Sequence, residues 1–342
     1  MKRNTLLALG CAALAIAGCA AHAQDNAAPA AGGTRTTTTP EGALMQIDED
    51  LPYKPGTLTQ EQLMSPTRSL FVLNGMNVFR RFPRENTAEI VKFYTEALKL
   101  RSLNPIQLTS SQQMLLTGVG SAQIKLAAGQ QGNRKYDMSG GYKAGTGIRF
   151  LTLTYPSEQD VIASFTAAGF PAPSFGDRGD GTRAAMVNDP SGFPLELVIR
   201  AGAKPGSNDG VGVNINTSDL ERSRAFYREF VGLDELPPVE DKLLGITRYP
   251  FRHGETTISL YHTGTNEPAD NGSAGIQYVV SDTPMVDAKA KARNIAVETP
   301  LNKLRGFELI TVWLNDPDGV TNYFAQVNAS AQPASNGGTG RR

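Results

Sequence analysis

The feature that most constrains the fold of this chain is an internal repeat, because two copies of one pattern predict two copies of one structure. Residues 86–98 have the apolar spacing of an amphipathic helix, and residues 219–231 repeat that spacing. The matched positions are Ile90, Phe93, Tyr94, Ala97 and Leu98 in the first segment and Ser223, Phe226, Tyr227, Phe230 and Val231 in the second. An apolar-rich strand, over residues 76–82 or 211–217, is predicted before each helix.

Two further pairs of segments repeat at nearly the same offset. Residues 147–150 parallel residues 275–278, and the turn at 188–192 parallels the turn at 315–319 before a final strand. The offset is 133 positions from Tyr94 to Tyr227 and 127 from Asp189 to Asp316. This order predicts four strand–helix–strands modules, paired into two α+β domains at residues 69–203 and 209–328.

The two ends of the chain have a different character. Residues 1–23 resemble an export signal, with Lys2 and Arg3 before an apolar stretch too short to span a bilayer, which needs about 20 residues. Cleavage after Ala23 and a lipobox ending at Cys19 are alternatives, and the second would add a lipid anchor. Residues 24–68 are predicted as a flexible linker and residues 329–342 as a disordered tail. The predicted location is the cell envelope, either periplasmic or membrane-anchored.

Composition restricts the chemistry of the mature chain. Both cysteines, Cys11 and Cys19, lie in the signal, so the body has no disulfide or thiolate metal site. Of the three histidines only His253 and His262 lie in the body. The formal net charge is +0 and no basic run is present, which gives a nucleic-acid partner no electrostatic support.

The repeated motifs resemble those of the vicinal oxygen chelate superfamily, which includes glyoxalase I, bleomycin- and fosfomycin-resistance proteins and extradiol dioxygenases. The segment 218–227, Ser-Asp-Leu-Glu-Arg-Ser-Arg-Ala-Phe-Tyr, is similar to its first helix, and residues 316–319, Asp-Pro-Asp-Gly, to its last turn. The resemblance covers about residues 70–328. It implies paired βαβββ modules, each pair curled around a cleft where a divalent metal often binds. Because four modules supply the pairing that smaller relatives obtain by dimerising, we expect a monomer.

The metal ligands that the resemblance implies are mostly replaced. The matching positions are Asn77, Lys125, Gly147, Glu196, Gly212, Ser259, Gly275 and Tyr323. Only Glu196 is a carboxylate, whereas zinc, nickel and iron sites need several imidazole or carboxylate ligands. No cofactor is therefore predicted, with a residual divalent metal on Glu196 kept as an alternative.

Lys125 and Glu196 are the predicted catalytic pair. The resemblance would place the Lys125 ammonium across one cleft from the Glu196 carboxylate, where the lysine would polarise a carbonyl and Glu196 would act as base. A solvated surface pair is the alternative. Strand alternation predicts a ligand-binding face with polar side chains. Its members are Arg149, Gln277, Asn214, Asn216 and Tyr323.

Two functional hypotheses follow. The first is an exported protein that binds a small molecule in a metal-poor cleft, as bleomycin-resistance proteins do. The second is a glyoxalase- or lyase-like, or dioxygenase-like, enzyme that uses Glu196 with Lys125 or with a residual metal. The missing ligands favour the first, and whether the chain is an enzyme stays open.

Overall fold

The computed structural model describes residues 35–38, 44–47, 57–107, 113–129, 138, 140–203, 210–267, 274–304 and 309–327. The predicted signal at 1–23 and the predicted tail at 329–342 lie outside the described residues. In the part of the chain that is described, none of the helices has the length and apolarity needed to cross a membrane.

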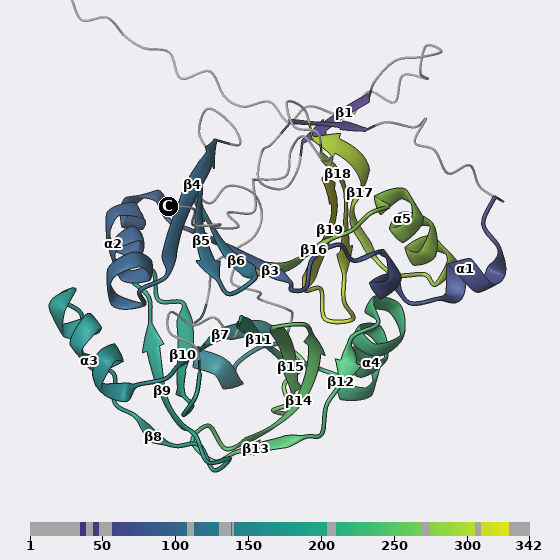
Figure 1. The fold of residues 1–342 in the computed structure, drawn as a ribbon. Coiled ribbons are helices and arrows are strands. Elements are labelled where there is room, and N and C mark those ends of the chain that lie inside the picture. The colour runs from purple at the N-terminus through teal and green to yellow at the C-terminus, as the bar shows by residue number, and fades with distance from the viewer. Residues whose placement is uncertain are drawn as a thin grey trace, which may run out of the picture. The chain divides into compact units, whose positions relative to one another are not determined.

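The four predicted modules are present, each with one helix between its first strand and its later strands (Figure 1). Module 1 contains β3 (Asn77–Phe82), α2 (Thr87–Lys92), a π-helical turn (Phe93–Ala97), β4 (Arg101–Gln107), β5 (Gln113–Val119) and β6 (Ala122–Ala128). Module 2 contains β7 (Gly147–Tyr155), α3 (Glu158–Ala167), β8 (Gly176–Asp177), β9 (Arg183–Asn188) and β10 (Pro194–Ile199).

The second half of the chain repeats this plan with one extra short strand. Module 3 contains β11 (Val211–Asn216), α4 (Leu220–Ala225), a π-helical turn (Phe226–Val231), β12 (Asp234–Glu235), β13 (Val239–Asp241), β14 (Ile246–His253) and β15 (Thr256–Tyr261). Module 4 contains β16 (Ala274–Val279), α5 (Thr283–Ala292), β17 (Val297–Leu304), β18 (Leu309–Asn315) and β19 (Thr321–Val327). The predicted α+β class with four such modules is confirmed.

The predicted domains at 69–203 and 209–328 imply that module 1 shares a sheet with module 2 and module 3 with module 4. The observed sheets combine the modules differently. One sheet has the order β1-β2-β17-β18-β19-β16-β3-β6-β5-β4 and joins modules 1 and 4. The other has the order β12-β14-β15-β11-β7-β10-β9-β8, with β13 paired to β14, and joins modules 2 and 3. The first strands make these joins, β3 with β16 and β7 with β11, each antiparallel. Each sheet therefore combines residues from both halves of the chain.

The inner faces of both sheets share one hydrophobic core. Val78 and Phe324 contribute to it from one sheet, and Leu151 and Ile258 from the other. The predicted helical stripes are buried in this core, which confirms their assignment. Helices α2 and α3 lie on one flank and α4 and α5 on the other (Figure 1). Because side chains alternate along a strand, the opposite face of each sheet is left for polar groups and ligands.

The repeated Asp-Pro turns have the same structure in both halves. The Asp189 carboxylate accepts from the backbone N–H of Ser191 and Phe193, and Asp316 accepts from those of Asp318 and Val320. These bonds satisfy the donors of a tight turn that leads into the last strand.

Part of the segment predicted as a linker, 24–68, is folded. Strands β1 (Arg35–Thr38) and β2 (Leu44–Ile47) form a hairpin, and β2 pairs with β17. Helix α1 (Gln60–Met64) has a capping box formed by Thr59 and Gln62. The Lys289 Nζ donates to the carbonyl oxygens of Gln62 and Ser65 at 2.7 and 2.8 Å. Composition missed this segment because its order comes from contacts with module 4.

Candidate functional site

Strand register shows which residues of the four modules occupy equivalent places on the faces opposite the core. In the sheet of modules 2 and 3, Glu196 lies opposite Thr152 and Ser259 opposite Asn214. In the sheet of modules 1 and 4, Lys125 lies opposite Phe79 and Tyr323 opposite Gln277. Of the eight predicted metal-ligand positions, the four on the last strands are therefore unchanged. The four on the first strands differ: the register gives Phe79, Thr152, Asn214 and Gln277 in place of Asn77, Gly147, Gly212 and Gly275.

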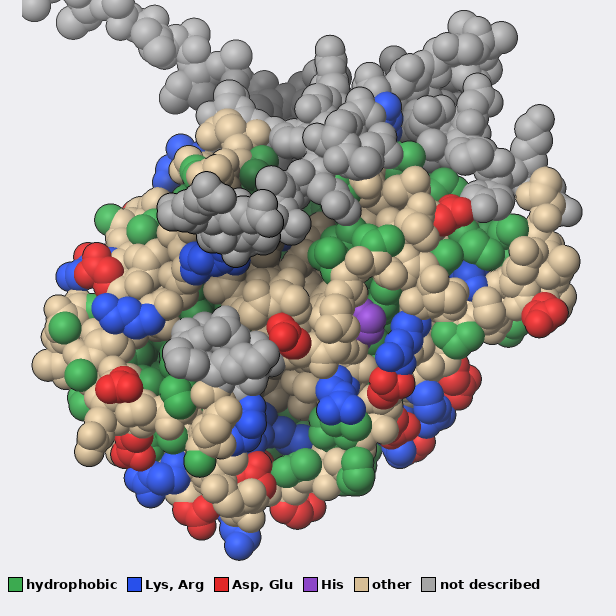
Figure 2. All heavy atoms as spheres, in the orientation of Figure 1, with side chains coloured by type: hydrophobic (Ala, Val, Ile, Leu, Met, Phe, Trp, Pro, Cys, Tyr) green, Lys and Arg blue, Asp and Glu red, His purple; other side chains and the backbone are tan. Residues whose placement is uncertain are grey.

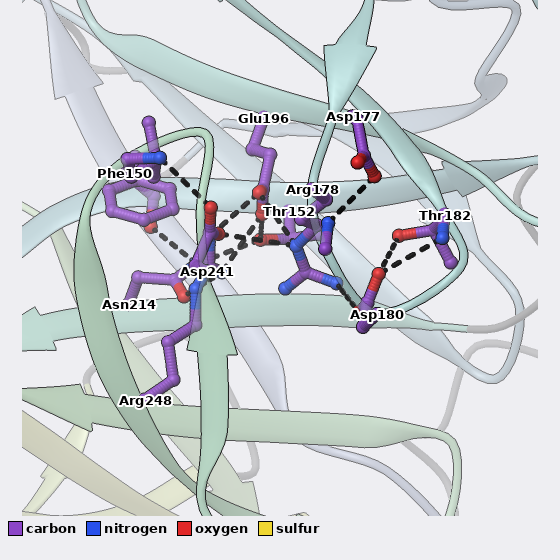
Figure 3. Close-up of polar contacts among 12 residues, drawn as sticks. Phe150, Thr152, Asp177, Arg178, Asp180, Thr182, Glu196, Asn214, Asp241 and Arg248 are labelled. Atoms are coloured by element: carbon purple, nitrogen blue, oxygen red, sulfur yellow. Dashed lines mark hydrogen bonds and ion pairs between the residues drawn. The ribbon is translucent and has the colours of Figure 1, made fainter.

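In the sheet of modules 2 and 3, a buried ion cluster fills the centre of this face (Figure 3). Arg248 of β14 makes a two-pronged contact with Glu196 of β10, Nη1 to Oε2 at 2.9 Å and Nη2 to Oε1 at 2.6 Å. The same guanidinium donates to Asn214 Oδ1 at 2.8 Å and pairs with Asp241. The exposed fractions of Glu196, Arg248, Asp241 and Asn214 are 0%, 2%, 1% and 1%. We call these four residues the Glu196–Arg248 cluster.

Hydroxyl and guanidinium groups complete the cluster. Thr152 Oγ1 donates to Glu196 Oε2 at 2.7 Å and accepts from Asn214 Nδ2 at 2.8 Å. Arg178, just after β8, lies 3.2 Å from Asp241 Oδ2 and 3.3 Å from Glu196 Oε1 through its Nε. Two carboxylates therefore face two guanidiniums. Burial, the largest influence, lowers the pKa of Arg248, but Glu196 and Asp241 outweigh it and the pKa is raised.

The residues at these positions do not fit a divalent metal ion. Both oxygens of Glu196 already accept charge-assisted hydrogen bonds, and the guanidinium of Arg248 takes up the space in front of them. The equivalent positions of the other sheet supply an ammonium, an amide, a phenol and a phenyl ring. Within the described residues, no group of three or more His, Cys, Asp and Glu side chains is placed to hold a metal.

The corresponding face of modules 1 and 4 has a different chemistry. Asn77 Nδ2 donates to Gln277 Oε1 at 3.0 Å across the β3–β16 junction. Beside this pair, the rings of Phe79, Trp313 and Tyr323 pack together, with centroids 5.0–6.4 Å apart. We call the surface formed by Lys125, Gln277, Thr299 and these three rings the module 1–4 face.

The aromatic group shows how strongly this sheet curls. Phe79 and Trp313 lie three strands apart, about 14 Å in a flat sheet, yet their centroids are 6.0 Å apart. Gly275 lies between them, where a Cβ atom would be 2.3 Å from Phe79 Cζ. The absence of a side chain at Gly275 thus lets the Phe79 ring reach across β16.

Lys125 is half-buried on the module 1–4 face, and among the described residues no ion pair or hydrogen bond engages its ammonium. Burial lowers its pKa from 10.5 to about 8. The predicted pair with Glu196 is wrong, because Lys125 belongs to β6 and Glu196 to β10, which are strands of different sheets. Glu196 is paired with Arg248 instead.

The predicted ligand-binding residues fall in four places. Asn214 belongs to the Glu196–Arg248 cluster, while Gln277 and Tyr323 belong to the module 1–4 face. Arg149 occupies a bulge between β7 and β11, and it donates to Gly141 O at 2.8 Å. Matching residues 147–150 with 275–278 made Arg149 the counterpart of Gln277. Strand register makes it Thr152 instead, because Thr152 lies opposite Glu196 as Gln277 lies opposite Tyr323. Asn216 binds Gly145 O and Thr263 Oγ1, which fixes two loops.

Sequence reasoning missed Arg248, Asp241, Phe79 and Trp313. Arg248 had a signal, since alternation along β14 puts it on the same face as the buried Ile246. It was overlooked because the resemblance directs attention to first and last strands. Trp313 and Asp241 also lie outside those strands, in β18 and β13.

Comparison with known proteins agrees with this architecture. Glyoxalase I from Zea mays superposes with a TM-score of 0.58 at 19% identity, over 72% of this chain and 91% of that protein. A putative dioxygenase from Bacillus subtilis superposes with a TM-score of 0.54 at 16% identity, over 76% of this chain and 86% of that protein. At such identities the likeness establishes the fold, which is that of a vicinal oxygen chelate protein with four modules. No curated protein sequence matches the chain.

Part of the sequence matches a known family. Residues 211–324 match the Glyoxalase/Bleomycin resistance protein/Dioxygenase superfamily. This region, which spans modules 3 and 4, belongs to that superfamily.

Proposed function

We propose that this protein binds a small organic molecule on the module 1–4 face without using a metal ion. The observation that carries the proposal is a group of polar atoms left unsatisfied beside the aromatic rings. Besides Lys125, Trp313 Nε1 and Thr299 Oγ1 are buried and make no hydrogen bond within the described part of the chain. A buried donor without a partner costs free energy, so a ligand that accepts from these groups would be favoured.

The Glu196–Arg248 cluster supports the same proposal by contrast. Its carboxylates and guanidiniums pair with one another, so the cluster stabilises the sheet of modules 2 and 3 rather than leaving a group free to react. The alternative enzyme that combines Glu196 with Lys125 loses its geometric basis, since the two side chains lie on separate sheets. The chain still has a fold shared with enzymes, and fold alone does not assign a reaction.

A thermal-shift screen with small organic compounds tests the proposal. We expect at least one compound to raise the Tm of the full-length chain by the same amount with and without EDTA, and elemental analysis to find substoichiometric metal. The Glu196→Gln variant, compared at its own unliganded Tm, should retain the ligand-induced shift. A shift that EDTA abolishes, or that disappears in Glu196→Gln, would contradict the proposal and favour an enzyme that depends on Glu196.

We also propose that the protein is exported to the cell envelope by residues 1–23. The support is the sequence pattern alone: Lys2 and Arg3, the apolar stretch, and a small-residue cleavage region. Mass spectrometry of the mature N-terminus separates the alternatives. A chain that begins at Gln24 indicates a free periplasmic protein, and an acylated Cys19 that Cys19→Ser abolishes indicates a lipoprotein. A chain that retains Met1 would contradict export by cleavage.

A further inference from the structure

We infer that the module 1–4 face binds a planar aromatic carboxylate with a second oxygen acceptor at its far end. This inference rests on the proposed function of the same face and names the class of ligand. Three observations carry it. Lys125 on β6 is a cation without a partner among the described residues. Three aromatic rings form a surface beside it, and two hydrogen-bond donors on β17 and β18, at the other end of this surface, have no acceptor there.

The cation is Lys125, which is half-buried and has no counter-ion among the described side chains. Arg81 adds positive charge nearby, since its guanidinium lies 5.5 Å from the centroid of the Phe79 ring. Lys125 lies opposite Phe79 in register and Arg81 is two residues further along β3, so both cations belong to the same face of these two strands. Glu298 is engaged by Thr321 Oγ1 at 2.7 Å. A partly desolvated cation without a partner favours an anionic ligand, and a carboxylate can accept from its three N–H donors.

The floor is made by Phe79, Trp313 and Tyr323. Tyr323 meets both other rings edge to face, at interplanar angles of 90° and 63°. Such a floor offers both ring faces and ring edges to a flat ligand, and aromatic pairs contribute beyond their buried area. A flat aromatic ligand fits this surface better than a sugar or a flexible chain.

The two donors lie on the opposite arm of the sheet, on β17 and β18. Thr299 pairs in register with Trp313, and 4% of Thr299 is exposed. Neither the Thr299 hydroxyl nor the Trp313 indole N–H has an acceptor among the residues that the structure describes. Lys125 lies on β6, four strands away from Trp313 in the sheet order. A ligand that satisfies both arms therefore needs its carboxylate at one end and another acceptor oxygen at the other.

The single tryptophan of the chain gives a direct readout. In a ¹H–¹⁵N spectrum of the labelled full-length protein, one indole N–H resonance reports on Trp313 alone. The probes are 6-hydroxy-2-naphthoate and its carboxamide, which share shape and hydroxyl but differ in charge. We expect the acid to shift the indole resonance and to bind more tightly than the amide by about tenfold to a hundredfold in calorimetry, the range for a charge-assisted hydrogen bond.

Variants assign the preference to Lys125. Lys125→Met should remove the preference, so that acid and amide bind with equal affinity, and Lys125→Arg should restore most of the preference for the acid. Lys291→Met is the matched control, because that lysine is 67% exposed on α5. Circular dichroism verifies that each variant is folded, and Lys125→Gln replaces Lys125→Met if the latter does not fold.

The outcomes separate this inference from the proposed function. Equal affinity for acid and amide, or a preference that survives Lys125→Met, overturns the anion assignment while binding on this face stands. If neither probe binds or moves the indole resonance, the inference is overturned, and the compound screen then decides the proposed function independently.

Discussion

At the scale of single residues, the two predicted catalytic groups differ in burial and in pairing. Glu196 is fully buried and has both oxygens engaged by Arg248. Lys125 is half-buried and unpaired. The difference comes from neighbours that no local pattern encodes: Arg248 enters from β14, whereas no described carboxylate pairs with Lys125. Ligand binding is therefore expected at Lys125, and a stabilising role in the folded structure at Glu196.

Replacement of Arg248 tests this division. Arg248→Met leaves Glu196 and Asp241 buried beside only Arg178, so we expect the free energy of unfolding in urea to fall by about 3–5 kcal/mol. The double variant Arg248→Met/Glu196→Gln should lose less than the single variant. Arg183→Met is the control. It breaks the ion pair with Glu158, in which the Arg183 side chain is 51% exposed and the Glu158 side chain 31%, so it should lower the free energy of unfolding by less than about 1 kcal/mol. A loss as small as the control's for Arg248→Met would show that the cluster contributes no net stability.

At the scale of elements, the two Asp-Pro turns are alike in backbone and different in charge. Asp189 forms a buried ion pair with Arg80. Asp316 has no such cation; its Oδ2 accepts from the Tyr227 hydroxyl at 3.0 Å. Burial, the chief cause, raises the pKa of Asp316 from 3.8 to about 7, against the lowering effect of its backbone donors.

This difference predicts a pH dependence of stability. Because the folded-state pKa of Asp316 is raised, its contribution is fully present below about pH 4 and is lost as the pH rises through about 7. The loss is up to about 4 kcal/mol, at 1.36 kcal/mol per pKa unit. Asp316→Asn should flatten the decline in urea unfolding measured from pH 4 to 8. Asp160→Asn, at an exposed position of α3, is the control, and an unchanged decline in Asp316→Asn would refute the assignment.

The β3–β16 junction predicts a coupling between Gly275 and Phe79. Gly275→Ala places a Cβ against the Phe79 ring and is expected to cost about 1–3 kcal/mol of stability, as overpacking does. In a Phe79→Ala background the same change should cost much less, so a double-mutant cycle by urea denaturation should show clear coupling. Additive costs would mean that Phe79 does not reach over Gly275.

At the scale of the molecule, each sheet is completed within one chain. Modules 1 and 4 close one sheet and modules 2 and 3 the other, so no second copy is needed to finish either face. Charged side chains of both signs are interspersed over the visible surface (Figure 2), in keeping with a formal net charge of +0.

A monomer is therefore expected in solution. Light scattering on the full-length chain should give a mass near 36.6 kDa over a range of concentrations. A concentration-independent mass of twice that value would contradict the prediction and would require a shared face that the sheet topology does not reveal.

The sequence by itself determined the elements of this protein. Apolar spacing located the helices that contain Tyr94 and Tyr227, and the Asp-Pro turns located the last strands, because these patterns depend on residues close in the chain. Tertiary structure decided how the modules pair and, through strand register, which positions are equivalent. Pairing depends on contacts more than 100 residues apart, such as Asn77 with Gln277. That choice separated Lys125 from Glu196 and brought Arg248 to the carboxylate.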